Sequence, residues 1–167
     1  NQAVAAARLG EEVYMIGCVG DDPYGSLMLK ALKDSHVKTD YVSVLEGVNT
    51  GTAHIILAEG DNSIIVIKGA NEKVTRDVVD KAFDVIRTSD LVMLQHEIPM
   101  DTIGYIIDRC CEEKVPVMLN PAPYMDIPED WIEKVTYTTP NEHEAALMFK
   151  GSDADEILKS QAGKVLM

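Results

Sequence analysis

The sequence is short of basic residues, cysteines and long apolar runs. Its 167 residues carry 15 Lys and Arg against 28 Asp and Glu, a formal charge of −13. So acidic a surface repels phosphate backbones and anionic lipid heads, which argues against nucleic-acid and membrane partners. No apolar run approaches the roughly 18 residues of a membrane-spanning helix, and no basic, apolar leader is visible. Cys18, Cys110 and Cys111 build no disulfide framework, so we expect a cytoplasmic protein.

Familiar catalytic and phosphate-binding patterns are also missing. The sequence contains neither the Gly-x-x-x-x-Gly-Lys-Ser/Thr loop nor the Gly-x-Gly-x-x-Gly fingerprint. The four histidines match no metal-ligand spacing. Cys110 and Cys111 are expected within a helix beside acidic residues, which raise a thiol pKa and disfavour a nucleophilic role. These absences argue against a protein with a classical P-loop or dinucleotide-binding loop, against a histidine-ligated zinc site and against an enzyme with a cysteine nucleophile.

Strand and helix patterns alternate along most of the chain. Apolar β-forming runs predict strands over residues 12–18, 91–95, 115–119 and 135–138. Between them the pattern predicts helices, including one capped by Asp22 with Pro23 at its first position, one from Thr75 to about residue 86, and others over 100–114, 141–149 and 152–161. Uniformly apolar strands that alternate with helices indicate a parallel sheet covered on both faces.

The segment 50–68 breaks this alternation. Two β-rich runs, 50–58 and 63–68, are joined by Glu59-Gly60-Asp61-Asn62, which predicts a hairpin that stands off the main sheet. Its apolar residues, 55–57 and 64–67, exceed what a two-stranded flap can bury alone. We expect either pairing with the hairpin of a second subunit or cover by further strands of the same chain.

Polar loops follow four of the predicted strands, at 20–22, 95–97, 120–123 and 139–142. In a doubly wound sheet, ligands bind beyond the carboxyl ends of the strands, so these loops are candidates for a site. Glu97 could accept hydrogen bonds from vicinal sugar hydroxyls, or it could cap a helix or carry a solvated charge. Both interpretations remain open on position alone, because most loops are polar.

A helix start is predicted at 139–142. Thr139 as N-cap, Pro140 at the first helical position and Glu142 three residues after the cap have the spacing of a capping box. Asp126 to Glu129 has the same spacing before a short helix. Asn141 and Glu144 are left without a capping role, and a phosphate-facing role remains open for them.

Several segments, in order along the chain, resemble motifs of the ribokinase, or PfkB-type, family of carbohydrate kinases. They cover nearly the whole sequence: Asn1–Gly10, Gly20–Gly25, Thr50–Ala53, Gly69–Asn71, Leu94–Glu97, Leu119–Pro123 and Thr139–Glu144. The resemblance implies an α/β fold with a Rossmann-like, doubly wound, mainly parallel sheet, incomplete at both ends, over residues 1–49 and 69–167. Residues 50–68 would form a small β-lid that closes over a sugar.

The resemblance also implies site residues. Asn1 and Glu97 match positions that hydrogen-bond ribose hydroxyls, and Ala53 and Ile55 match lid positions that touch the sugar. His54 alternates with these two and so faces the other way. Asn141 matches a nucleotide-phosphate contact. Glu144 completes an Asn-x-x-Glu motif associated with magnesium.

The activity implied is ATP-dependent phosphorylation of D-ribose by a longer protein that uses Mg²⁺ and has a K⁺ site. The apolar surface of the hairpin adds the expectation of a homodimer formed through the lid. A fructokinase, a nucleoside kinase and a non-catalytic sugar-binding module remain alternatives. The family's glycine-rich turn would precede Asn1, and the Gly-Ala-Gly-Asp motif that carries the catalytic base and anion hole would follow Met167. The 167-residue chain alone is therefore expected to be inactive.

Overall fold

The computed structural model describes residues 1–58 and 61–148. The chain divides between Ala82 and Phe83 into two compact units. Each unit contains parallel strands with helices, so the predicted α/β class with parallel sheets is confirmed. No helix within the described ranges is long and apolar enough to cross a membrane.

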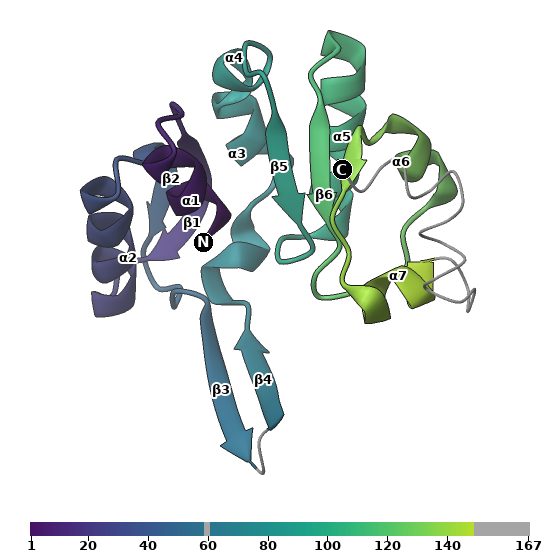
Figure 1. The fold of residues 1–167 in the computed structure, drawn as a ribbon. Helices are drawn as coiled ribbons and strands as arrows, with labels where there is room; N and C mark the ends of the chain where they lie inside the picture. The colour runs from purple at the N-terminus through teal and green to yellow at the C-terminus, as the bar shows by residue number, and fades with distance from the viewer. Residues whose placement is uncertain (59–60, 149–167) are drawn as a thin grey trace. The chain divides into compact units, whose positions relative to one another are not determined.

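The first unit opens with a parallel strand pair. Its elements in order are α1 (Gln2–Arg8), β1 (Tyr14–Gly20), α2 (Pro23–Asp34) and β2 (Lys38–Leu45), and β1 pairs in parallel with β2 (Figure 1). The predicted cap of α2 is confirmed, because Asp22 Oδ1 accepts a 2.7 Å hydrogen bond from Gly25 N and Pro23 is the first helical residue. Cys18, Leu32 and Val37 are buried and form part of the core between helix and strands.

The predicted hairpin is present in this unit. β3 (Thr52–Ala58) and β4 (Asp61–Ile67) are antiparallel, with Ala53 opposite Val66 and Ile55 opposite Ile64. Among the described strands, these two pair only with each other (Figure 1). Residues 59 and 60 of the predicted turn lie outside the described ranges.

A short 3₁₀ helix, η1 (Gly69–Lys73), and α3 (Arg76–Lys81) complete the first unit. The helix predicted from Thr75 to about residue 86 begins at the predicted cap, Thr75, but it is not continuous. The helical conformation breaks at Ala82, whose φ of −101° and ψ of 4° form a tight turn, and α4 (Phe83–Ile86) begins after it. Ala82 is fully buried, so tertiary packing overrides a helical pattern that continues through this position.

The second unit is a three-stranded parallel sheet with helices. Its elements after α4 are β5 (Val92–Gln95), α5 (Met100–Glu113), β6 (Val117–Asn120), α6 (Glu129–Lys134), β7 (Tyr137–Thr138) and α7 (Glu142–Met148), and the strand order is β5-β6-β7. The core-facing side of α5 includes Ile103, Ile107 and Cys110, all fully buried. The predicted helix at 152–161 lies outside the described residues.

The predicted start of α6 was wrong. Asp126 does not cap this helix, because Pro128 is the N-cap and Glu129 is the first helical residue. A proline disfavours helical backbone at the residue before it, here Ile127, so the helix begins only after the proline.

Candidate functional site

Three of the four predicted polar loops lie at one edge of the second unit. They follow β5, β6 and β7, which run parallel, so their carboxyl ends meet at the same edge of the sheet. This edge holds Glu97, Asn120, Asn141 and Glu144. The fourth loop, 20–22, belongs to the first unit.

Glu97 carries an unpaired carboxylate on a fixed loop. Its side chain is exposed and has no hydrogen bond or ion pair with any residue in the described ranges. The neighbouring His96 fixes the backbone, because its N–H donates to Ala122 O at 3.0 Å and its ring Nδ1 lies 3.3 Å from Pro123 O. The loop geometry is therefore maintained without any help from the Glu97 side chain.

His96 is a feature that sequence reasoning missed. Its ring is fully buried, and Nε2 has no hydrogen-bond partner among residues 1–58 and 61–148. Burial lowers the pKa of His96, against smaller opposing effects from Pro123 O and the charge of Glu144. A neutral ring with Nδ1–H donating to Pro123 O fits this environment. The only sequence signal was its place directly after an apolar strand.

Asn141 and Glu144 cap α7 reciprocally. Asn141 Oδ1 accepts from Glu144 N at 2.8 Å, and Glu144 Oε2 accepts from Asn141 N at 2.9 Å. The predicted capping box of Thr139 and Glu142 was therefore wrong. The Thr139 carbonyl instead accepts a 2.7 Å hydrogen bond from Asn120 Nδ2, which ties Thr139 to the end of β6 and moves the helix start to Glu142.

This capping box limits what Glu144 can offer a metal ion. Glu144 is 8% exposed, and one of its two oxygens is committed to the box. Within the described ranges no three His, Cys, Asp or Glu side chains gather as a metal site. A single carboxylate fits Mg²⁺ only in the manner usual for nucleotide sites, where phosphates and waters supply the other ligands.

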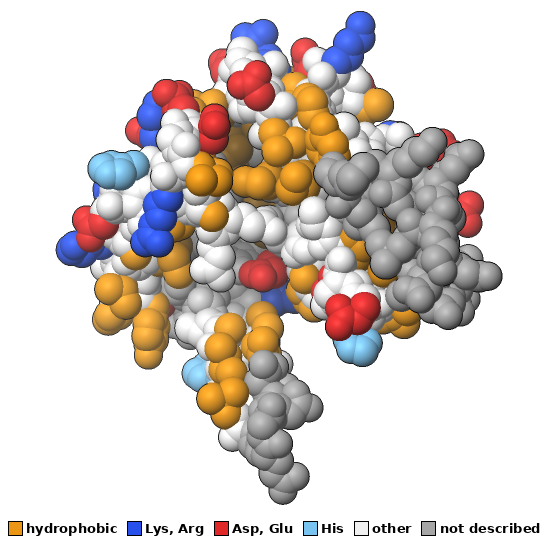
Figure 2. Space-filling view, in the orientation of Figure 1, with side chains coloured by type: hydrophobic (Ala, Val, Ile, Leu, Met, Phe, Trp, Pro, Cys, Tyr) orange, Lys and Arg blue, Asp and Glu red, His pale blue; other side chains and the backbone are white. Residues whose placement is uncertain are grey.

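The hairpin presents Ala53 and Ile55 on one face. They alternate with Thr52 and His54, which lie on the other face with Thr52 Oγ1 3.3 Å from His54 Nε2. Ile55 is 64% exposed. Figure 2 shows hydrophobic side chains along the hairpin, and those exposed include Ile55, Ile56, Leu57, Ile64, Ile65, Val66 and Ile67.

Asn1 is the N-cap of α1, but its side chain makes no capping hydrogen bond. Only its carbonyl is used there, accepting from Ala5 N at 2.9 Å. Asn1, Ala53 and Ile55 thus belong to the first unit, whereas Glu97 and the Asn141–Glu144 pair belong to the second.

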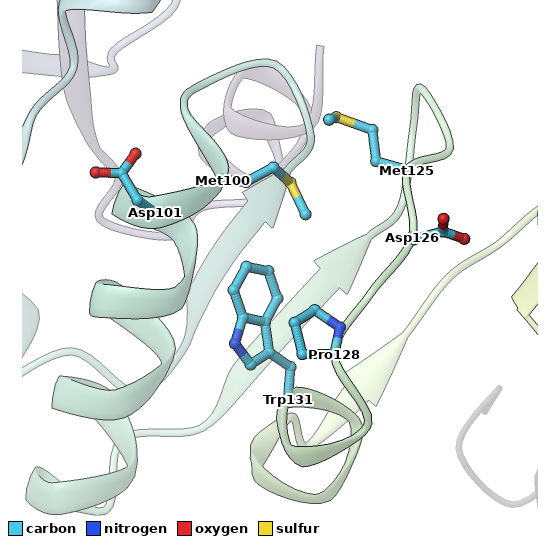
Figure 3. Close-up of a pocket in the computed structure, with 6 residues that line it drawn as sticks. All are labelled: Met100, Asp101, Met125, Asp126, Pro128 and Trp131. Atoms are coloured by element: carbon cyan, nitrogen blue, oxygen red, sulfur yellow. The ribbon is translucent and has the colours of Figure 1, made fainter.

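The second unit also contains an open pocket of about 500 Å³, which is not the predicted sugar-binding site. Figure 3 shows the side chains of Met100, Met125 and Trp131 gathered around it, while the carboxylates of Asp101 and Asp126 point away from its centre. A sugar pocket requires polar groups that converge on the ligand. This pocket contains none of the predicted site residues.

Asp22 and Thr50 form a second polar cluster that sequence reasoning missed as a pair. Hydrogen bonds from the backbone of Thr50 and of Gly25 lower the pKa of Asp22. The sequence identified Asp22 as a helix cap and Thr50 as the start of a β-rich run, and it placed each in a separate motif without linking the two. Their 28-residue separation left no local signal.

Comparison with known proteins places the chain in a family. The pfkB family of carbohydrate kinases matches residues 1–166. The chain is 45% identical over 167 residues to the ribokinase of Bacillus subtilis (strain 168), covering 100% of this chain and 57% of that protein. It is 33% identical over 150 residues to the deoxyribokinase of Salmonella typhi, covering 89% and 49%.

A solved structure agrees with these matches. The structure of Arabidopsis thaliana ribokinase complexed with ribose and ATP has a TM-score of 0.78 at 29% identity, covering 99% of this chain and 56% of that one. The chain spans about half the length of the relatives it matches. From its strand and helix order, its motifs and these matches, the chain belongs to the pfkB family of carbohydrate kinases.

Proposed function

We propose that the full-length protein transfers the terminal phosphoryl group of ATP to the 5-hydroxyl of D-ribose, producing ribose 5-phosphate and ADP. The observation that carries the proposal is the unpaired Glu97 carboxylate at the end of β5, in a chain 45% identical to a ribokinase. An ionised carboxylate offers two acceptor oxygens, and two vicinal hydroxyls can donate to them together.

Three residues of the first unit are also proposed to contact the sugar. The Asn1 side-chain amide, which makes no capping bond, is available to both donate to and accept from hydroxyls. Ala53 and Ile55 share one exposed face of the hairpin and would cover the apolar face of the sugar ring.

The nucleotide would bind at the carboxyl edge of the second unit. Asn141 would contact a phosphate, and Glu144 would interact with Mg²⁺ through its remaining oxygen or through water. When bound, the Mg²⁺ ion neutralises charge on the phosphates. The K⁺ site, the anion hole and the catalytic base belong to the proposal as groups supplied by the longer protein.

The exposed hairpin supports a homodimer. A two-stranded hairpin is marginal in water by itself, and a large exposed apolar surface usually marks an interface. Pairing with the hairpin of a second copy about a two-fold axis would bury Ile56 and Ile65, which are 51% and 54% exposed and lie on the face opposite Ala53 and Ile55. Light scattering at micromolar concentration should give a dimer mass for the full-length protein. A monomer would contradict this part of the proposal.

A cytoplasmic location is supported by cysteine usage. Cys18, Cys110 and Cys111 are all free thiols, as expected in a reducing compartment.

The substrate is tested by a coupled ADP-release assay on the full-length protein with ribose, 2-deoxyribose, fructose and adenosine. 2-Deoxyribose is the second candidate, because the chain is 33% identical to a deoxyribokinase. It lacks the 2-hydroxyl of the diol to which Glu97 would bind. We expect the highest kcat/KM with ribose and none above background with the 167-residue chain alone. Equal kcat/KM for ribose and 2-deoxyribose, or preference for fructose or adenosine, would contradict the proposal.

A further inference from the structure

A partly buried hydrogen-bond network holds the base of the hairpin. Thr50 is 7% exposed and lies two residues before β3 begins. Its hydroxyl donates to Asp22 Oδ1 at 2.7 Å and accepts from Gly20 N at 2.9 Å, and its backbone N–H donates to Asp22 Oδ2 at 2.8 Å. Asp22 Oδ1 also accepts from Gly25 N. We call Asp22, Thr50, Gly20 and Gly25 the stem network.

The returning strand is held at the same place. Ala70 N donates to Asn49 O at 2.8 Å, so the residue before Thr50 is bonded to the residue after Gly69. A Cβ at Gly69 would lie 2.4 Å from Asn49 O, and Gly69 has a φ of +50°. A Cβ at Gly51 would lie 2.6 Å from Lys68 O. Both ends of the hairpin are therefore packed backbone against backbone.

The position of the hairpin depends on this stem. β3 and β4 pair with no other described strand, and their apolar side chains are exposed. Ile55 lies five residues beyond Thr50, about 16 Å along an extended strand, so a rotation of about 10° at the stem moves it by about 3 Å. A misplacement of about 1 Å can already reduce catalysis by about 100-fold.

We propose that Asp22 is a positioning residue that, through Thr50, sets where the sugar-covering face of the hairpin lies. This inference rests on the proposed function, because it assigns Ala53 and Ile55 to the sugar. Asp22 itself need not touch the substrate. Both of its carboxylate oxygens already accept hydrogen bonds within the stem network.

Asp22→Asn separates this role from helix capping. Asparagine is as good an N-cap as aspartate, so α2 keeps its cap through the remaining oxygen. The amide NH₂ that replaces Oδ2 faces the Thr50 N–H, so a donor meets a donor. Thr50→Val removes the hydroxyl bonds with little change in shape, and Thr50→Ser restores the hydroxyl.

The kinetic test uses the full-length protein. We expect Asp22→Asn and Thr50→Val to raise the ribose KM by about fivefold or more, with the ATP KM within about twofold of wild type. Thr50→Ser should return the ribose KM toward the wild-type value. Asp40→Asn, an exposed acid on β2, is the matched control and should leave both constants unchanged. Ribose KM values within twofold of wild type for both Asp22→Asn and Thr50→Val would overturn the inference.

Hydrogen exchange tests the stem without relying on activity. Peptides covering 52–67 should exchange at least about threefold faster in Asp22→Asn than in wild type, while peptides from α5 exchange at the same rate. Unchanged exchange in the hairpin would overturn the inference. Faster hairpin exchange in a protein that does not phosphorylate ribose would contradict the proposed function alone and leave the stem network supported.

Discussion

Asp22 and Glu97 each follow a parallel strand, β1 and β5, and each lies in a polar loop, but the molecule uses the two carboxylates differently. Asp22 accepts three hydrogen bonds from Gly25 and Thr50, and its pKa is lowered by them. Glu97 has no such partner among the described residues. A carboxylate that is satisfied by the protein determines backbone position, whereas an unpaired one on a fixed loop is available to a ligand.

Glu144 lies between these two cases. One oxygen, Oε2, is committed to the capping box with Asn141, and the other, Oε1, takes no part in that box. His96 shows the same contrast within a single ring, with Nδ1 near Pro123 O and Nε2 without a partner in the part of the chain that the structure describes. The number of hydrogen-bond partners that a polar group has within the protein, more than its residue type or loop position, distinguishes structural groups from candidate binding groups here.

The largest stability effect is expected at the stem network. Thr50→Val leaves the buried Gly20 N–H without its 2.9 Å acceptor and removes one donor to Asp22. An unsatisfied buried group costs about 1–3 kcal/mol, so the melting temperature of the full-length protein should fall by several degrees. Circular dichroism or calorimetry measures this. An unchanged melting temperature for Thr50→Val would show that the stem network does not stabilise the protein. Asp22 would then not differ from an ordinary surface acid.

A smaller effect is expected at the α7 cap. Asn141→Ala should destabilise the second unit by about 1 kcal/mol, because it removes an N-cap. Asn141→Ser retains a capping side chain and should recover most of that loss. If Asn141 also contacts nucleotide, the ATP KM should stay raised in Asn141→Ser although stability returns. An ATP KM that returns together with stability would leave Asn141 with the structural role alone.

Glu144→Gln extends this comparison. Glutamine can reach back to the Asn141 N–H as glutamate does, so the capping box and stability should be kept. The charge is lost, so the concentration of Mg²⁺ needed for half-maximal activity should rise by roughly a few-fold, because one charge-assisted contact is weakened. Retained stability with an unchanged Mg²⁺ requirement would contradict the proposed magnesium role.

A pH effect is expected from His96. Burial holds its folded-state pKa below the unfolded value of about 6.5, so the unfolded chain binds a proton first as the pH falls. The associated stability is fully present above pH about 6.5 and is lost as the pH falls toward the folded pKa. His96→Leu should flatten the melting-temperature profile between pH about 7 and 5 relative to wild type. If the melting temperatures of His96→Leu and wild type change in parallel over this pH range, His96 is not a buried neutral ring.

The smallest expected effect separates two adjacent thiols on α5. Burial raises the pKa of Cys110 to about 11, and Cys111 is exposed. In the native protein at pH about 8, maleimide should label Cys111 and leave Cys110 unlabelled, as read by peptide mass spectrometry. Activity should be unchanged by the label. Equal labelling of both thiols would contradict the packing of α5.

Local signals predicted much of the fold. The Asp22-Pro23 cap and the two alternating runs around residue 60 depend on neighbours within a few residues, and both were confirmed. The start of α7 was not predictable, because Thr139 and Asn141 are both good caps. The choice is made by Asn120, which binds the Thr139 carbonyl from another strand.

The candidate site follows the same pattern. The parallel strands β5, β6 and β7 were predictable from apolar runs, so the edge that holds Glu97 and Asn141 could be located. The link from Thr50 to Asp22 crosses 28 residues and involves backbone groups, which no sequence spacing encodes. The burial of His96 likewise depends on packing, since its sequence neighbours are Gln95 and the exposed Glu97.

The most direct test of the account is ribose affinity in the full-length protein with and without charge at residue 97. Glu97→Gln keeps the shape and turns one acceptor into a donor, and charge-assisted bonds contribute about 1.5–3 kcal/mol each. Titration calorimetry and kinetics should give ribose Kd and KM values raised about tenfold or more, with the ATP KM and the melting temperature unchanged. An unchanged ribose affinity, or a melting temperature that falls together with every kinetic constant, would contradict the assignment of Glu97 to the sugar.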